Sequence, residues 1–236
     1  MTGISRRAWL RGSAGIAGLG LLAGQGRRLF AAAGMPPREI AGYGPLAPAR
    51  DLATDPPLLR LPPGFSYRSL GWANEALAGD YPTPAAHDGV GIVASNGDTL
   101  TLVRNHERAL ASPILAPARY DAMTPAGQSF APAGGTTTLT FRGRHWTGAL
   151  PSLGGTIYNC AGGATPWGTW LSCEETVIDL TPRGGRKHGY VFEVRADPAA
   201  TTGRPIVAMG RMLHEAVAID PATHIAYLTE DEPCNS

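Results

Sequence analysis

The sequence predicts an all-β protein, with a β-propeller as the favoured architecture. Glycine and proline are abundant, with 31 and 21 of 236 residues. Short apolar runs alternate with turn residues along the chain, and no amphipathic helix stands out after the N-terminal segment. Short strands separated by glycine and proline are typical of sandwiches, barrels and propellers. A hydrophobic content of 43% is enough for one substantial domain with its own core.

The N-terminal segment has the features of an export signal. The stretch "SRRAWL" at 5–10 precedes a weakly apolar, glycine-rich run, and Ala31 and Ala33 form a small-residue cleavage site. Twin arginines in this order predict a twin-arginine signal peptide over residues 1–33, with an amphipathic helix as the alternative. We therefore expect a periplasmic or secreted protein that the twin-arginine translocase exports already folded, without a stable membrane anchor.

Removal of the signal changes the charge balance. Residues 1–33 contain five arginines and no acidic residue, so the remaining chain has 15 basic and 19 acidic residues. A net charge of −4 with one lysine, Lys187, argues against nucleic acid and anionic membranes as partners.

The elements follow in order. Residues 34–63 are rich in proline and read as an extended segment, and residues 64–236 read as the partial propeller. Asn96 and Gly97 separate two alternating apolar runs and predict a hairpin. Further strands are expected at 136–141, 168–173 and 189–194, and a second hairpin at 215–230 that turns at 220–223.

A weak repeat favours the propeller over the other all-β architectures. An apolar strand runs into an acidic cluster three times, in "TLTLVRNHE", "GTWLSCEE" and "IAYLTEDE". The starts lie 55–70 residues apart, about the length of a large four-stranded blade. Equivalent strands of successive blades would bring the three clusters to one end of a central channel. Chance recurrence is the alternative, because surface turns also carry acids.

These clusters are candidates for metal binding. Calcium needs six to eight oxygen ligands from distant segments. Seven acidic residues would supply them: Glu107, Glu174, Glu175, Glu215, Glu230, Asp231 and Glu232. The thiolate of Cys160 would suit iron rather than calcium. The alternative for Cys160 is a buried structural thiol or a disulfide with Cys173, which would leave Cys234 alone.

Several common enzyme classes lack their motifs here. No histidine follows four residues after His214, which excludes the zincin motif, and no G-x-S-x-G occurs. No lysine follows Gly162 and Gly163 to complete a P-loop. The tryptophans Trp167 and Trp170 are both expected in the core.

Together these stretches resemble the PhoX family of bacterial alkaline phosphatases. The resemblance rests on "SRRAWL", "LVRNHE" (102–107), "AGGTTTL" (133–139), "NCAGGATPWGTWLSCEE" (159–175), "GYVFEV" (189–194), "GRMLHEAVAIDP" (210–221) and "YLTEDEPCNS" (227–236). It covers the chain from about Tyr67 onward. It implies a twin-arginine-exported β-propeller that hydrolyses phosphate monoesters with a cluster of Fe³⁺ and Ca²⁺.

The resemblance also implies roles for individual residues. Cys160 would be the thiolate ligand of iron, and Glu174 and Glu215 would bind or bridge metals. Glu107 and Glu175 are further ligand candidates, and one of Glu230 and Asp231 would coordinate. Asn105 would donate a hydrogen bond to the substrate phosphate.

The sequence departs from the family in one respect. Family members continue beyond "DEPCNS", so later blades, further carboxylate ligands and a phosphate-binding arginine would be missing. We expect a fragment of a longer reading frame, with a truncated gene product or a diverged small protein as alternatives. Two other functions stay open, namely a non-catalytic calcium-binding propeller and a propeller lactonase, which would have no use for a thiolate.

Overall fold

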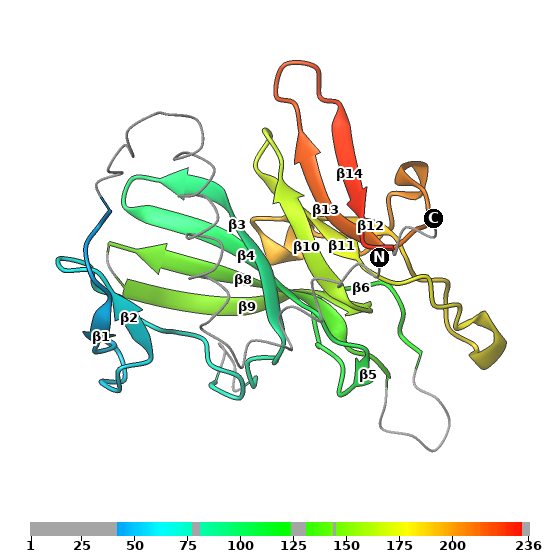
Figure 1. Ribbon diagram of the computed structural model, residues 1–236. Coiled ribbons are helices and arrows are strands. Elements are labelled where there is room, and N and C mark those ends of the chain that lie inside the picture. Colours follow the sequence, from blue (N-terminus) through cyan, green and yellow to red (C-terminus); the bar gives the residue numbers. More distant parts are fainter. Residues whose placement is uncertain (1–41, 77–80, 124–130, 144, 233–236) are drawn as a thin grey trace, which may run out of the picture. The chain divides into compact units, whose positions relative to one another are not determined.

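The computed structural model describes residues 42–76, 81–123, 131–143 and 145–232 (Figure 1). Within these ranges the chain forms fourteen strands and three single-turn 3₁₀ helices, and no longer helix. The all-β prediction is confirmed. The chain divides into two compact units, with the described residues up to 69 in the first and those from 70 to 232 in the second. The expected signal peptide, residues 1–33, lies outside the described residues.

The first unit contains a small ribbon within the proline-rich segment. Strands β1 (Ala47–Ala49) and β2 (Leu59–Leu61) pair antiparallel. Asp51 follows β1 and is buried, and its carboxylate accepts hydrogen bonds from the backbone N–H groups of Ala53 (3.0 Å) and Ser69 (2.8 Å). This side chain therefore ties the loop after β1 to the end of the unit.

The second unit begins with a five-stranded sheet in the order β3-β4-β8-β9-β6. Its strands are β3 (His87–Asn96), β4 (Thr99–His106), β8 (Gly134–Arg142), β9 (His145–Thr156) and the short β6 (Ala118–Arg119). All pairs are antiparallel except β6 with β9. A two-stranded ribbon of β5 (Leu110–Ala111) and β7 (Ala131–Pro132) accompanies it. The hairpin at Gly97 is confirmed, with a loop of Gly97 and Asp98 because Asn96 pairs with Thr99.

A three-stranded sheet and a hairpin follow. The sheet consists of β10 (Asn159–Ala164), β11 (Thr169–Glu174) and β12 (Val191–Arg195), and the hairpin of β13 (His214–Ile219) and β14 (Ala226–Glu230). The strands expected at 136–141, 168–173 and 189–194 and the hairpin at 215–230 are confirmed. Strand β9 had no prediction. Strand β10 had none either, because it is rich in glycine and lacks alternation.

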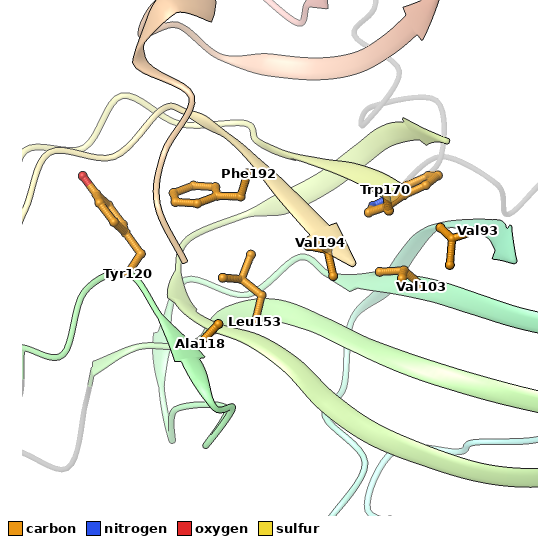
Figure 2. Close-up of a cluster of buried hydrophobic side chains, with 8 residues drawn as sticks. All are labelled: Val93, Val103, Ala118, Tyr120, Leu153, Trp170, Phe192 and Val194. Atoms are coloured by element: carbon orange, nitrogen blue, oxygen red, sulfur yellow. The ribbon is translucent and has the colours of Figure 1, made fainter. Parts of the chain in front are cut away.

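The main core lies between the first two sheets (Figure 2). Val93, Val103 and Leu153 come from the five-stranded sheet, while Trp170, Phe192 and Val194 come from the three-stranded sheet. Tyr120 closes one end, with its ring 5.0 Å from that of Phe192. Burial of these aromatic and branched side chains holds the two sheets face to face.

A second cluster holds the other face of the three-stranded sheet against β13 and β14. Leu171, Val191 and Val217 are its buried members, together with Cys173. The three sheets therefore stack in chain order, and no sheet closes on itself within the described residues.

The predictions for the tryptophans and cysteines are resolved in part. Trp170 is buried, as expected, but Trp167 is 50% exposed, and its indole N–H donates to Glu193 (2.9 Å), so the core prediction for Trp167 is wrong. Cys160 and Cys173 are both free thiols, which excludes the disulfide between them. Cys234 lies outside the described residues.

Candidate metal centre

Three side chains from two sheets meet at one point. The Cys160 sulfur and one carboxylate oxygen each of Glu175 and Glu215 all lie within 4.8 Å of one another. Cys160 is the second residue of β10, Glu175 directly follows β11, and Glu215 is the second residue of β13. The Cys160 Sγ to Glu215 Oε1 distance is 3.6 Å. A thiol and two carboxylates at this separation are a donor set for a metal ion.

Two more carboxylates surround the same thiol. Asp88 Oδ1, near the start of β3, is 3.9 Å from Cys160 Sγ. Burial raises the pKa of the Cys160 thiol, and four neighbouring carboxylates raise it further: Asp88, Glu215, Glu175 and Glu107. Negative charge thus gathers around the thiol, and it disfavours the thiolate form of Cys160. A bound cation would reverse this balance, because it favours both the thiolate and the ionised carboxylates.

Asp88 had no prediction, although a signal for it exists in the sequence. The tetrapeptides "HDGV" at 87–90 and "HEAV" at 214–217 share a histidine, an acid, a small residue and a valine. Asp88 and Glu215 are the second residues of β3 and β13, so this pattern marks equivalent positions.

Strand β10 lies between β3 and β13 (Figure 1). Small residues allow these three strands to approach one another closely. A Cβ atom on Gly89 would lie 2.8 Å from the Ala161 Cα, and one on Gly163 would lie 2.0 Å from the Val217 carbonyl oxygen. A Cβ on Gly162 would lie 1.9 Å from the Leu171 oxygen. The close approach that these glycines permit is therefore to protein backbone.

A buried polar network fixes the backbone at Cys160. Asn105 is fully buried, and its side-chain amide donates to the carbonyl oxygens of Cys160 (2.9 Å) and Ala161 (2.7 Å). Its Oδ1 accepts from Trp170 Nε1 (3.0 Å) and Ser172 Oγ (2.9 Å). The structure thus places Asn105 beneath the Cys160 backbone. The phosphate contact expected for Asn105 stays a prediction.

Glu174 belongs to a different group from its neighbour Glu175. It is fully buried, and Oε1 accepts from the Ile157 N–H (2.9 Å) and His188 Nδ1 (2.6 Å). Its Oε2 accepts from the N–H groups of Gly189 (2.8 Å) and Tyr190 (3.2 Å). These four bonds occupy both oxygens, so the structure does not bring Glu174 to Cys160. Its metal ligation is a prediction that the geometry does not support.

His188 lies between Glu174 and a second acid. His188 Nε2 is 3.3 Å from Asp121 Oδ2, and all three side chains are buried. Burial disfavours the imidazolium, but the hydrogen bonds and charges of Glu174 and Asp121 outweigh it and raise the pKa of His188. This network fixes the end of β11, the residue before Glu175.

The last two candidates lie at the end of β14. Glu230 is exposed, and its Oε1 accepts from the Leu213 N–H (3.1 Å). Asp231 is partly buried, and its N–H donates to the Leu213 carbonyl (3.3 Å). Glu232 is exposed. None of these three is in the group formed by Cys160 and its neighbours in the described part of the chain.

Comparison with known proteins identifies the family. The family described as alkaline phosphatase PhoX matches residues 41–150 and 118–236. Because these matches cover most of the chain, the protein belongs to this family. Its members are metal-dependent phosphatases that are typically exported. Neither the curated proteins nor the solved structures gave a match. Within the described residues, no helix is long and apolar enough to cross a membrane.

Proposed function

Starting from membership of the PhoX family, we propose that this chain is an exported, metal-dependent phosphomonoesterase or the N-terminal part of one. The observation that carries the proposal is the convergence of Cys160, Glu175 and Glu215 within 4.8 Å in a member of a phosphatase family. The substrates are small phosphate esters, and the product is inorganic phosphate.

The donor chemistry fits the two metals that the family resemblance implies. Cys160 would bind Fe³⁺, because iron accepts mixed sulfur and oxygen ligands. The carboxylates of Glu175 and Glu215 would bind iron and Ca²⁺, with Glu107 as a further oxygen donor. Metals held here would neutralise charge on the phosphoryl oxygens and activate the attacking water.

The chain's own residues hold that site in place. The β10 backbone carries Cys160 between β3 and β13, where Gly89 and Gly163 permit contact. The Asn105 side-chain amide donates to the carbonyl oxygens of Cys160 and of the next residue, Ala161. We assign Asn105 to orienting Cys160, since a phosphate contact would require these bonds to be given up.

The arrangement of the sheets favours the propeller. Blades of a propeller are antiparallel sheets that pack face to face in chain order around a channel. In the proposal the five-stranded sheet, the three-stranded sheet and the β13–β14 hairpin are successive blades, and β3, β10 and β13 line the channel. The division into a signal peptide (1–33), an extended segment (34–63) and a partial propeller (64–236) belongs to the same proposal.

Hydrolysis of p-nitrophenyl phosphate by the full chain, expressed in a host with twin-arginine export, tests this function. Turnover should disappear after chelation of calcium and return when calcium is added. Cys160→Ser should lose iron and turnover, whereas Cys173→Ser, which alters a buried thiol of the second core cluster, should keep both. Calcium binding without turnover would favour the binding propeller. Lactone hydrolysis that survives Cys160→Ser would favour the lactonase.

A further inference from the structure

The three sheets share one repeated hairpin. In β3–β4, β10–β11 and β13–β14, a first pair of residues is followed by a register shift. The first pairs are His87 with His106, Asn159 with Glu174, and His214 with Glu230. The next pairs are Val90 with Arg104, Gly162 with Ser172, and Val217 with Leu228. Each first strand therefore advances three residues while its partner advances two.

This offset is a β-bulge at the same position in all three hairpins. Bulges re-aim side chains and are common beside active sites. The first bulged residues are Asp88, Cys160 and Glu215, and the second are Gly89, Ala161 and Ala216. Small second residues leave room for the neighbouring strand, as the contact of Gly89 with Ala161 shows.

A second backbone feature recurs with the bulge. The residue after each second strand donates its N–H to the residue before the first strand. The three bonds are Glu107 to Ala86 (2.8 Å), Glu175 to Tyr158 (2.9 Å) and Asp231 to Leu213 (3.3 Å). Glu107, Glu175 and Asp231 are thus equivalent positions, and each is an acid.

The residue one position earlier has a different role from these acids, and the role is the same in every hairpin. His106 Nδ1 bonds to the Ala85 carbonyl (3.1 Å), Glu174 Oε1 accepts from the Ile157 N–H (2.9 Å), and Glu230 Oε1 accepts from the Leu213 N–H (3.1 Å). Each side chain holds the backbone that leads into the first strand. These positions secure the hairpin rather than face the thiol.

We propose that each bulged hairpin contributes two side chains to one metal centre, so that Asp88 and Asp231 are ligands while Glu174 and Glu230 are not. The proposal rests on the proposed function, because it concerns the same site. The complete set is Asp88, Cys160 and Glu215 from the bulges and Glu107, Glu175 and Asp231 from the strand ends. Three of the five carboxylates in this set, Asp88, Glu175 and Glu215, already lie around the Cys160 thiol.

Calcium titration of the iron-loaded, calcium-stripped full chain tests this assignment by calorimetry. Asp88→Asn and Asp231→Asn should each raise the calcium dissociation constant by about tenfold or more. Glu230→Gln, which keeps an acceptor for the Leu213 N–H, should change it by less than about twofold, as should the exposed control Asp98→Asn. Metal content by mass spectrometry gives an independent measure of the same losses.

The outcomes separate this assignment from the function itself. Wild-type protein that binds neither iron nor calcium would overturn both. Wild-type protein that binds metal and hydrolyses phosphate esters, with Asp88→Asn or Asp231→Asn unaffected, would overturn only the hairpin assignment. Glu230→Gln weakening calcium as much as Asp231→Asn would do the same.

Discussion

Two buried acidic groups lie one residue apart at the end of β11, and the chain treats them differently. The Glu174 carboxylate accepts hydrogen bonds from three backbone N–H groups and contacts His188. Burial lowers the pKa of His188, but its contacts with Glu174 and Asp121 outweigh burial and raise it. Glu175 lies beside Cys160 and Glu215, where negative charge accumulates. The charge of Glu174 is thus balanced by hydrogen bonds from the protein itself.

The comparison separates stability from function. A paired and fully hydrogen-bonded carboxylate supports the fold whether or not metal is present. Negative charges gathered around a thiol repel one another in the metal-free protein, and a bound cation stabilises them. Substitutions in the first group should therefore act on folding, and those in the second on metal binding.

The largest effect is expected from His188→Ala. It leaves Glu174 and Asp121 buried without the side chain that bonds to both and should lower the free energy of unfolding by about 3–5 kcal/mol. Urea denaturation in the presence of a chelator measures this loss. His145→Ala, at an exposed position of β9, is the matched control and should stay within about 0.5 kcal/mol. Equal stability of the two variants would contradict the structural role of the Glu174 network.

The next effect comes from the contact between β10 and β13. Gly163→Ala places a methyl group 2.0 Å from the Val217 carbonyl oxygen, so the strands must separate. We expect a loss of about 1–3 kcal/mol and weaker iron binding, because Cys160 and Glu215 move apart. Gly148→Ala on β9, where nothing lies within 4 Å, is the control and should leave iron content unchanged. Normal iron content in Gly163→Ala would show that this close approach does not set the site.

The pH dependence of the metal-free protein sharpens the comparison further. Because the folded pKa of His188 is raised, its contribution is fully present below the unfolded value of about 6.5 and is lost as pH rises through the folded pKa. The free energy of unfolding should fall there by at most about 1.4 kcal/mol per pH unit. Denaturation curves at successive pH values test this, and His188→Gln should remove this part of the slope. An identical slope in the variant would assign the dependence to other groups.

The smallest effect on stability is expected from Glu175→Gln. Removing one negative charge beside Cys160 should change the metal-free unfolding free energy by less than about 1 kcal/mol, and in the stabilising direction. The same substitution should weaken metal binding by about tenfold or more. Thermal melts with and without added calcium and iron measure both. A large loss of metal-free stability would mean that Glu175 behaves like Glu174.

The strands were predictable where their pattern is local. The alternating runs around Gly97 identified the hairpin, and the threonine-rich run at 136–141 identified β8, whose residues from Gly134 to Leu139 are all buried. Strand β10 had no such pattern, because Gly162 and Gly163 serve contacts with the backbone of Leu171 and Val217. The contact with Val217 is long-range, and composition shows neither contact.

The site was predictable only in part for the same reason. The clusters after β4, β11 and β14 pointed to the strand ends, and Glu107, Glu175 and Asp231 occupy equivalent places there. Adjacent acids could not be told apart, since the choice between Glu174 and Glu175 depends on pairing with Tyr158 and His188. Asp88 was missed because the likeness of "HDGV" to "HEAV" gives no position in space, and the bulge that aligns Asp88 with Cys160 is a property of strand register.

The most direct test of the metal centre is X-ray absorption at the iron edge of the purified full chain, compared with Cys160→Ser. The proposed function predicts one sulfur ligand on iron in the wild-type protein, and its loss, with most of the iron, in the variant. Iron that is bound only by oxygen and nitrogen, or whose spectrum is unchanged by Cys160→Ser, would contradict a centre built on Cys160, Glu175 and Glu215.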